Sequence, residues 1–236
     1  MRKFPGRFKS TKTDSSQNYE INKYLIINDF HTKKREISRQ DNVVAFFIDP
    51  GTKNCGIRCT KKTSSGEKEL VYFNLVNFGE KNECLHGCLA KTVNVLTTFK
   101  DILTECDYVV IEKQLSQNVD LTRQMQNIET CIMILTKDQG RRPIIIEVDA
   151  RAKSIAFEKC TEEHLKPISR HMKNKQTKEK GKDAAMTLLE EEDDSLSIMA
   201  INATKKKDDM SDVVCYEYVW WKYLEEMNIP TKLTIT

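Results

Sequence analysis

The sequence predicts an α/β protein whose core is a five-stranded mixed sheet, three strands antiparallel and two parallel, flanked by helices. Two observations predict this class. Three short β-forming stretches follow one another between residues 43 and 76 with only turn signals between them, which is the pattern of an antiparallel meander. Two later apolar runs, at 108–112 and 143–148, are separated by a stretch of helical periodicity, as expected for parallel strands joined by a helical crossover.

The meander begins with the segment around which the chain is organised. Residues 43–49 form a continuous run rich in β-branched and aromatic side chains, and this run ends in Asp49 before a Pro-Gly turn signal. Such a run is typical of a buried strand. The second strand is expected at 56–61, and a hairpin turn at 64–67 leads into the third strand at 69–76.

Helical periodicity fills most of the remaining chain. Apolar side chains recur every three or four positions through 83–104 and 120–139, which predicts one helix in each segment. Further helices are predicted, in chain order, at 150–157, 183–191 and 208–227. The polar, lysine-rich segment 160–182 is expected to be a mobile basic loop.

The composition indicates one domain with polar extensions, because 39% of the 236 residues are hydrophobic and 31% are charged. Residues 1–41 are assigned as a flexible basic arm, in which 24–27 could add a short strand or a docking segment. The folded domain spans 42–227, and 228–236 form a tail. No apolar run approaches the length of a membrane span and no signal-peptide pattern opens the chain, so a soluble intracellular protein with no membrane partner is expected.

The net charge and the cysteine spacing bear on two function classes, nucleic-acid binding and zinc binding. The formal net charge of +3 is too small to indicate a nucleic-acid partner, but local clusters of lysine and arginine, as at 166–182, can follow a phosphate backbone. Cys55 and Cys59 fall on a predicted strand, and Cys84 and Cys88 fall in a helical pattern. Neither spacing brings two sulfurs together on a turn, so buried reduced thiols are expected rather than a zinc site.

Acidic side chains stand at the ends of two predicted strands and at the start of the last helix. Asp49 ends the first strand and Glu112 the fourth. Because these strands are predicted to be parallel neighbours, both carboxylates can lie at the same edge of the sheet. Asp209 and Asp212 are three positions apart on the last helix, so they share a face that can point at this edge. Asp208 remains an alternative to Asp209, one acting as the helix cap and the other as the ligand.

Four carboxylates in one place repel one another and need a counter-charge to stay ionised. Taken singly, each has an ordinary role as a turn cap, a salt-bridge partner or a helix cap. Their order along the chain, each on a suitable element, favours a shared site. Ligands that are all oxygen favour a hard divalent cation, Mg²⁺ or Mn²⁺. Two such ions about 4 Å apart can clamp the attacking water and the leaving oxygen of a phosphodiester.

Three motifs in this order also carry a family resemblance. They are Ile48-Asp-Pro-Gly-Thr52 with Gly56, then Ile111-Glu-Lys-Gln114 followed by Asn118 and a Met/Gln-rich helix ending at Glu129, and finally Lys207-Asp-Asp-Met-Ser-Asp212. The chain from 43 to 224 resembles the RuvC-type Holliday junction resolvases of the RNase H-like superfamily, in particular those of poxviruses and iridoviruses. The resemblance implies an RNase H-like fold, a homodimer and Mg²⁺-dependent nicking of four-way DNA junctions.

The resemblance also implies roles for single residues. Asp49 would bridge two Mg²⁺ ions, which Mn²⁺ can replace, while Glu112 would hold one ion and Asp209 with Asp212 the other. Lys153 stands where the family has a catalytic lysine and would stabilise charge developing on the phosphate. Its ordinary alternative is an exposed helical lysine. In-line hydrolysis of the phosphodiester would leave 5′-phosphate and 3′-hydroxyl ends.

Two sets of residues are expected to contact DNA. Thr52 and Lys53 follow the first carboxylate closely, and Lys113 and Gln114 follow the second within the resolvase motif. The family's basic segment would bind backbone phosphate independently of base sequence, here through Lys173, Lys175, Lys178, Lys180 and Lys182. The viral likeness further implies a role in viral DNA recombination, repair and replication, including concatemer resolution, in a replication compartment of the host cytoplasm or nucleus.

Three other function classes fit parts of the sequence. Another RNase H-like nuclease, acting on RNA–DNA hybrids or flaps, would use the same carboxylates. A non-catalytic nucleic-acid-binding protein could share the fold, although retention of all the acidic residues argues against it. The segment 49–52 also resembles a motif of actin-like ATPases, but these need a second glycine-rich phosphate loop, and after Gly87 only Gly140 and Gly181 occur.

Overall fold

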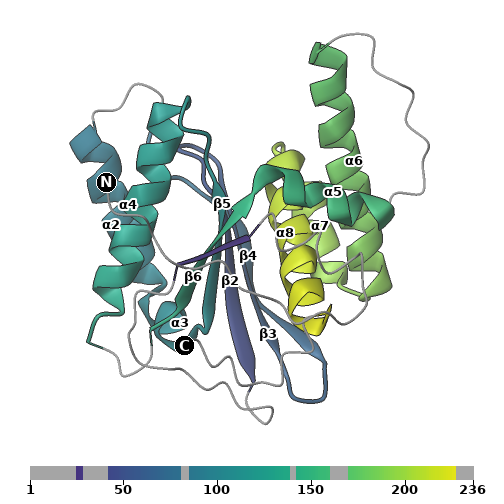
Figure 1. The fold of residues 1–236 in the computed structure, drawn as a ribbon, viewed down its shortest axis with the longest axis horizontal. Helices are drawn as coiled ribbons and strands as arrows, with labels where there is room; N and C mark the ends of the chain where they lie inside the picture. Colours follow the sequence, from purple (N-terminus) through teal and green to yellow (C-terminus); the bar gives the residue numbers. More distant parts are fainter. Residues whose placement is uncertain (1–24, 29–41, 81–84, 139–141, 160–169, 227–236) are drawn as a thin grey trace, which may run out of the picture.

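The computed structural model describes residues 25–28, 42–80, 85–138, 142–159 and 170–226. Their core is one six-stranded mixed sheet in the spatial order β1-β6-β5-β2-β3-β4 (Figure 1). In chain order the strands are β1 (Leu25–Asn28), β2 (Val43–Asp49), β3 (Cys55–Lys62), β4 (Lys68–Val76), β5 (Tyr108–Lys113) and β6 (Ile144–Asp149).

The strand pairing confirms the predicted mixed sheet. β2, β3 and β4 are antiparallel neighbours, while β5 and then β6 continue the sheet on the other side of β2 in parallel. For the segment near 24–27, the structure shows a strand rather than a docking segment. β1 pairs antiparallel with β6, with Leu25 opposite Val148, and so adds a sixth strand at the edge.

Helices cover both faces of the sheet (Figure 1). One face carries α2 (Leu85–Thr98), α3 (Lys100–Glu105) and α4 (Val119–Leu135). The other side carries η1 (Ala150–Ala152), α5 (Lys153–Ala156), η2 (Phe157–Lys159), α6 (Arg170–Glu191), α7 (Ser195–Ala203) and α8 (Lys207–Glu226). The protein is therefore a three-layer α/β fold, with α8 packed directly on the central strands.

Side chains of the central strand β2 divide between two hydrophobic cores. Phe46 and Ile48 pack in the core beneath α2 and α4, whereas Ala45 and Phe47 pack in the core beneath α8. The division follows from the two-residue period of a strand. Asp49 continues the series of Ala45 and Phe47, so the last residue of β2 is directed to the α8 side.

The helix expected over 83–104 is interrupted. Two helices, α2 and α3, meet at Phe99, which has φ −97° and ψ 7°. The buried Phe99 ring packs edge-to-face on Phe46 and Tyr72, with ring centroids 5.7 and 4.8 Å apart. Anchoring of this ring to the sheet fixes the backbone at Phe99, so tertiary packing breaks a helix whose apolar periodicity continues on both sides.

The expectation of a loop over 160–182 is wrong from Arg170 onward, because α6 begins there and runs to Glu191. The C-terminal half of α6 buries Ala184, Ala185 and Leu188 in a core shared with α8. This packing anchors the helix, and the good helix propensity of lysine lets it extend back through the basic segment. Residues 160–169 lie outside the described residues.

Two further expectations concern cysteines and membranes. Cys55 and Cys59 are buried free thiols on β3, while Cys84 lies outside the described residues. Within the described ranges, no helix has the length and apolar character needed to cross a membrane.

Candidate metal centre

Asp49 and Glu112 stand beside each other at the carboxyl ends of two parallel strands. Ile48 of β2 pairs with Ile111 of β5, so the next residue of each strand is level with its neighbour. Both acidic residues continue the alternation that directs side chains to the α8 core. The sheet therefore presents two carboxylates to the start of α8.

Asp212 approaches these carboxylates from α8. Gly56, which pairs with Asp49 across β2 and β3, lies against the first turn of this helix. A Cβ atom at Gly56 would be 2.4 Å from the backbone carbonyl oxygen of Asp209, so only glycine permits this approach. One carboxylate oxygen from each of Asp49, Glu112 and Asp212 lies within 4.8 Å of the others. The structure thus brings together three of the four predicted carboxylates.

Lys153, the first residue of α5, reaches the same place. Its Nζ donates a hydrogen bond to Oδ2 of Asp212 at 2.5 Å, and the two side chains are 16% and 21% exposed. Burial acts to lower the pKa of Lys153, but the charges of Asp212, Glu112 and Asp49 outweigh burial and raise the pKa. Lys153 is therefore a fixed cation beside the carboxylates and not an exposed helical lysine.

The carboxylates carry more negative charge than Lys153 neutralises. Burial, followed by the charges of Glu112 and Asp212, raises the pKa of Asp49 well above its usual range. Burial also raises the pKa of Asp212, although Lys153 opposes this effect. An all-oxygen donor set in which the ionised acids are destabilised fits a hard divalent cation, which would relieve the repulsion.

The first turn of α8 separates the roles of Asp208 and Asp209. Asp208 forms an ion pair with Lys178 of α6, and this contact lowers its pKa against the opposing effect of burial. Asp209 is half-buried and lies outside the group formed by the other three carboxylates. Burial and the charge of Asp208 raise the pKa of Asp209 to about 6. The structure therefore does not bring Asp209 into the group of three carboxylates, and Asp208 is engaged with α6.

Tyr216 is the residue at this site that the sequence analysis missed. It follows Asp212 by one helical turn and is 1% exposed. Its hydroxyl is buried without a hydrogen-bond partner among the described residues. The phenol pKa is raised well above its usual value by burial and then by the charges of Glu112, Asp212 and Asp49. The four-residue spacing from Asp212 was the signal that could have found it.

The predicted DNA contacts near the strand ends do not all face the carboxylates. Lys53 is exposed in the turn after β2 and pairs with Glu80 at 2.9 Å. Lys113 points to the opposite face of the sheet from Glu112, where it pairs with Glu147 at 3.2 Å. Thr52 and Gln114 are half-buried in the segments that follow β2 and β5.

α6 passes beside the carboxylates at Gly181. A Cβ atom at Gly181 would lie 3.4 Å from Oδ1 of Asp212, and the thiol of Cys215 donates to the Gly181 carbonyl oxygen at 3.6 Å. These contacts fix α6 against α8. They place the lysines of α6 on a helix that borders the site rather than on a loop.

The predicted phosphate-binding lysines of α6 are largely accessible. The side chains of Lys175 and Lys178 are 71% and 62% exposed. Lys175 pairs with Glu179 one turn later at 3.9 Å, and Lys180 is half-buried. Lys173 lies within α6. The exposed cations can therefore exchange their present partners for phosphate.

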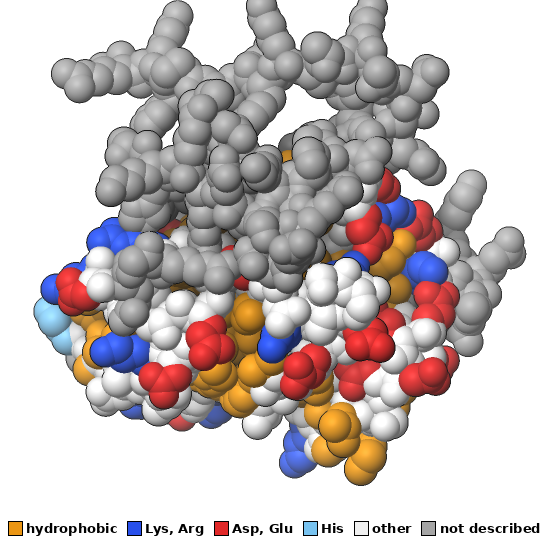
Figure 2. All heavy atoms as spheres, turned by 90° about the horizontal axis from the view of Figure 1, so that it is seen from below, with side chains coloured by type: hydrophobic (Ala, Val, Ile, Leu, Met, Phe, Trp, Pro, Cys, Tyr) orange, Lys and Arg blue, Asp and Glu red, His pale blue; other side chains and the backbone are white. Residues whose placement is uncertain are grey.

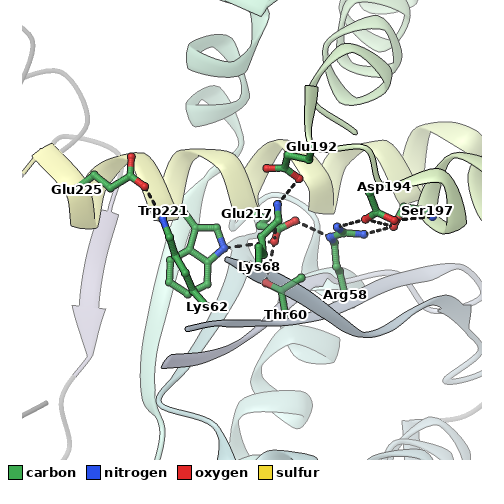
Figure 3. A network of polar contacts seen from close by, with 10 residues as sticks. All are labelled: Arg58, Thr60, Lys62, Lys68, Glu192, Asp194, Ser197, Glu217, Trp221 and Glu225. Atoms are coloured by element: carbon green, nitrogen blue, oxygen red, sulfur yellow. Dashed lines mark hydrogen bonds and ion pairs between the residues drawn. The ribbon is translucent and has the colours of Figure 1, made fainter. Parts of the chain in front are cut away.

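A buried network holds α8 against the sheet (Figure 3). Arg58 of β3 is fully buried and donates to Glu217 of α8 at 2.5 Å, to Ser197 at 2.6 Å and to Asp194 at 2.8 Å. Glu217 also accepts a hydrogen bond from Thr60 at 2.7 Å. The network joins β3, α7 and α8 through side chains distant in sequence, and it fixes the helix that carries Asp212.

The face drawn in Figure 2 carries both signs of charge. Acidic and basic side chains are interspersed over its described part, with hydrophobic side chains between them. This distribution agrees with the small formal net charge of +3.

Comparison with solved structures identifies the fold. The chain is similar to the yeast mitochondrial Holliday junction resolvase Ydc2, with a TM-score of 0.53 and 12% identity over 84% of this chain and 83% of that chain. Thermus thermophilus RuvC matches with a TM-score of 0.46 and 12% identity over 76% of this chain and 96% of that chain. No family model matches the sequence, and no curated protein matches it. The likeness to Ydc2, together with the strand order, shows an RNase H-like α/β fold.

Proposed function

We propose that this protein is a metal-dependent endonuclease that resolves four-way DNA junctions. The observation that carries the proposal is the convergence of Asp49, Glu112 and Asp212, from three separate elements, within 4.8 Å of one another. The buried hydroxyl of Tyr216, which has no hydrogen-bond partner within the described ranges, is a second observation that favours a bound ligand. The fold shared with a protein described as a Holliday junction resolvase supports the choice of substrate.

The carboxylates and Lys153 have different proposed roles in the reaction. Asp49, Glu112, Asp212 and Asp209 would hold two divalent cations, with Asp49 available to both ions, Glu112 to one, and Asp209 with Asp212 to the other. When bound, Mg²⁺ or Mn²⁺ supplies Lewis acidity and lowers the pKa of water. Lys153, held by Asp212, presents a fixed positive charge to the phosphate and stabilises the charge that develops in the transition state. Hydrolysis leaves 5′-phosphate and 3′-hydroxyl ends.

The substrate is proposed to lie along α6 and to be cut twice. The exposed lysines of α6 bind backbone phosphate next to the carboxylates, which positions DNA without reading its sequence. A homodimer supplies a second site for the paired nick in the opposing strand. The three sequence motifs further support a resolvase of the poxvirus and iridovirus type, acting in viral DNA recombination, replication and concatemer resolution within the host cell. Apart from β1 (Leu25–Asn28), which belongs to the sheet, residues 1–41 and 228–236 are proposed as extensions of the nuclease domain.

The test is cleavage of a labelled mobile four-way junction in the presence of Mg²⁺, beside linear duplex and an RNA–DNA hybrid. The wild-type protein should nick the junction in preference to both. Asp49→Asn should slow nicking at least about 1,000-fold, because several kcal/mol of transition-state stabilisation is lost with the metal. Asp101→Asn, which changes an exposed acid on α3, is the matched control and should cut like the wild type.

Three results would contradict the proposal. Equal nicking by wild type and Asp49→Asn would remove the carboxylates from the chemistry. Junction binding without any metal-dependent cleavage would favour a non-catalytic binding protein. Preferential cleavage of the RNA–DNA hybrid would favour another RNase H-like nuclease.

A further inference from the structure

The Tyr216 hydroxyl is an unusual group to find in the core between α8 and the sheet. The side chain is 1% exposed and packs in the same cluster as Val213, Val219 and Trp220 of its own helix. The hydroxyl nevertheless has no hydrogen-bond partner in the described part of the chain. A buried hydroxyl left unpartnered destabilises the folded state, so phenylalanine would serve the packing better than tyrosine does.

The surroundings of this hydroxyl are the three carboxylates. After burial, the charge of Glu112 has the largest effect on the phenol pKa, followed by those of Asp212 and Asp49. The face of the Tyr216 ring also lies next to Lys153, whose Nζ is 5.5 Å from the ring centroid. The hydroxyl of Tyr216 therefore lies near the group of carboxylates, and Glu112 is the carboxylate whose charge raises its pKa most.

Glu112 differs from Asp212 in the side chains that interact with it. Asp212 accepts a hydrogen bond from Lys153, whereas Glu112 interacts with the carboxyl group of Asp49 and the hydroxyl of Tyr216. Carboxylates that ligate metal ions are generally held in place by hydrogen bonds from a second layer of residues. A ligating carboxylate uses one oxygen for the cation and leaves the other able to accept a hydrogen bond.

We propose that Tyr216 is a positioning residue whose hydroxyl donates a hydrogen bond to Glu112 when the site holds a divalent cation, and so fixes the orientation of this ligand. The inference rests on the proposed metal-dependent function. It explains why a polar group is retained where packing alone favours an apolar one.

The experiment is a titration of Mn²⁺ onto the DNA-free protein, followed by electron paramagnetic resonance of the free ion. Tyr216→Phe should bind Mn²⁺ about 10–100-fold more weakly than the wild type, because residues that hold metal ligands contribute on this scale. Tyr223→Phe is the matched control. It removes the same atom from a buried tyrosine two turns further along α8, where burial alone perturbs the pKa of the phenol.

Urea unfolding without metal separates positioning from a purely structural role. The metal-free Tyr216→Phe protein should be at least as stable as the wild type, since it loses only an unpartnered group. Unchanged Mn²⁺ affinity in Tyr216→Phe would overturn the inference while leaving the metal centre intact, whatever the stability of the variant. Failure of the wild type itself to bind Mn²⁺ would instead overturn the proposed function together with this role.

Discussion

At the scale of single residues, the buried carboxylate of Asp49 is unfavourable in its ionised form in the folded protein. Its pKa is raised above the ordinary value by burial and by Glu112. A carboxyl group with a raised folded-state pKa is protonated in the native protein while it is ionised in the unfolded chain, so stability falls as pH rises toward the folded pKa. At neutral pH, the ionised cluster therefore destabilises the metal-free protein.

We expect Asp49→Asn to raise the free energy of unfolding of the metal-free protein at pH 7 by about 1 kcal/mol, because it removes one of three mutually repelling charges. Urea unfolding measures this change. Addition of Mg²⁺ should reverse the order, since the wild type gains stability from the cation and the variant does not. A variant less stable than the wild type without metal would show that the carboxylate has a stabilising partner.

The pKa of Glu217 shifts in the opposite direction from that of Asp49. Burial acts to raise its pKa, but the charges of Arg58 and Lys68 and a hydrogen bond from Thr60 lower the pKa to about 2. An unfolded glutamate has a pKa of about 4.3. The ionised form therefore contributes stability that is complete above about pH 4.3 and is lost as pH falls toward 2.

Protonation of Glu217 alone should lower the free energy of unfolding of the wild type by about 3 kcal/mol between pH 5 and pH 2. Glu217→Gln should be about 3–5 kcal/mol less stable at pH 7, because it removes one of the two carboxylates that pair with the buried Arg58 guanidinium. The same variant should lose less stability on acidification. Parallel acid-unfolding curves for the two proteins would contradict the assigned role of the network.

At the scale of elements, the five strands between 43 and 149 were predictable, whereas β1 was only one of two alternatives and several helix boundaries were not predicted. The strand at 43–49 was evident because a short β-rich run ends at a turn signal, and the ends of β2 and β5 located Asp49 and Glu112. α6 was missed because the apolar residues that anchor it are confined to its C-terminal half. The break at Phe99 was missed because it depends on contacts with Phe46 and Tyr72, which periodicity does not report.

The helical form of α6 leads to a prediction about DNA binding. Replacing both Lys175 and Lys178 with alanine should weaken junction binding and reduce the slope of log affinity against log salt concentration by about 2, because each phosphate contact contributes about one unit. Binding measured from low to moderate salt tests this. The double variant Lys100→Ala with Lys137→Ala, which removes two exposed charges from the opposite side of the sheet, should leave the slope unchanged.

At the scale of the whole molecule, the site depends on contacts between distant parts of the chain. Arg58 and Glu217 are separated by 159 positions, and no local pattern links them. Tyr216 had one local signal, its four-residue spacing from Asp212, but its position beside Glu112 is evident only when α8 lies over β5. Sequence reasoning found the acidic residues because each ends or begins a recognisable element. It could not find the groups that hold α8 in place, because their partners are set by the packing of the complete fold.

The central claim is that carboxylates from β2, β5 and α8 act together on a phosphodiester. Its most direct test is Mg²⁺-dependent nicking of a four-way junction by Glu112→Gln and Asp212→Asn, with DNA binding measured in parallel. The account predicts that both variants bind the junction but lose nicking to a similar extent as Asp49→Asn. Wild-type nicking rates in either variant would contradict it.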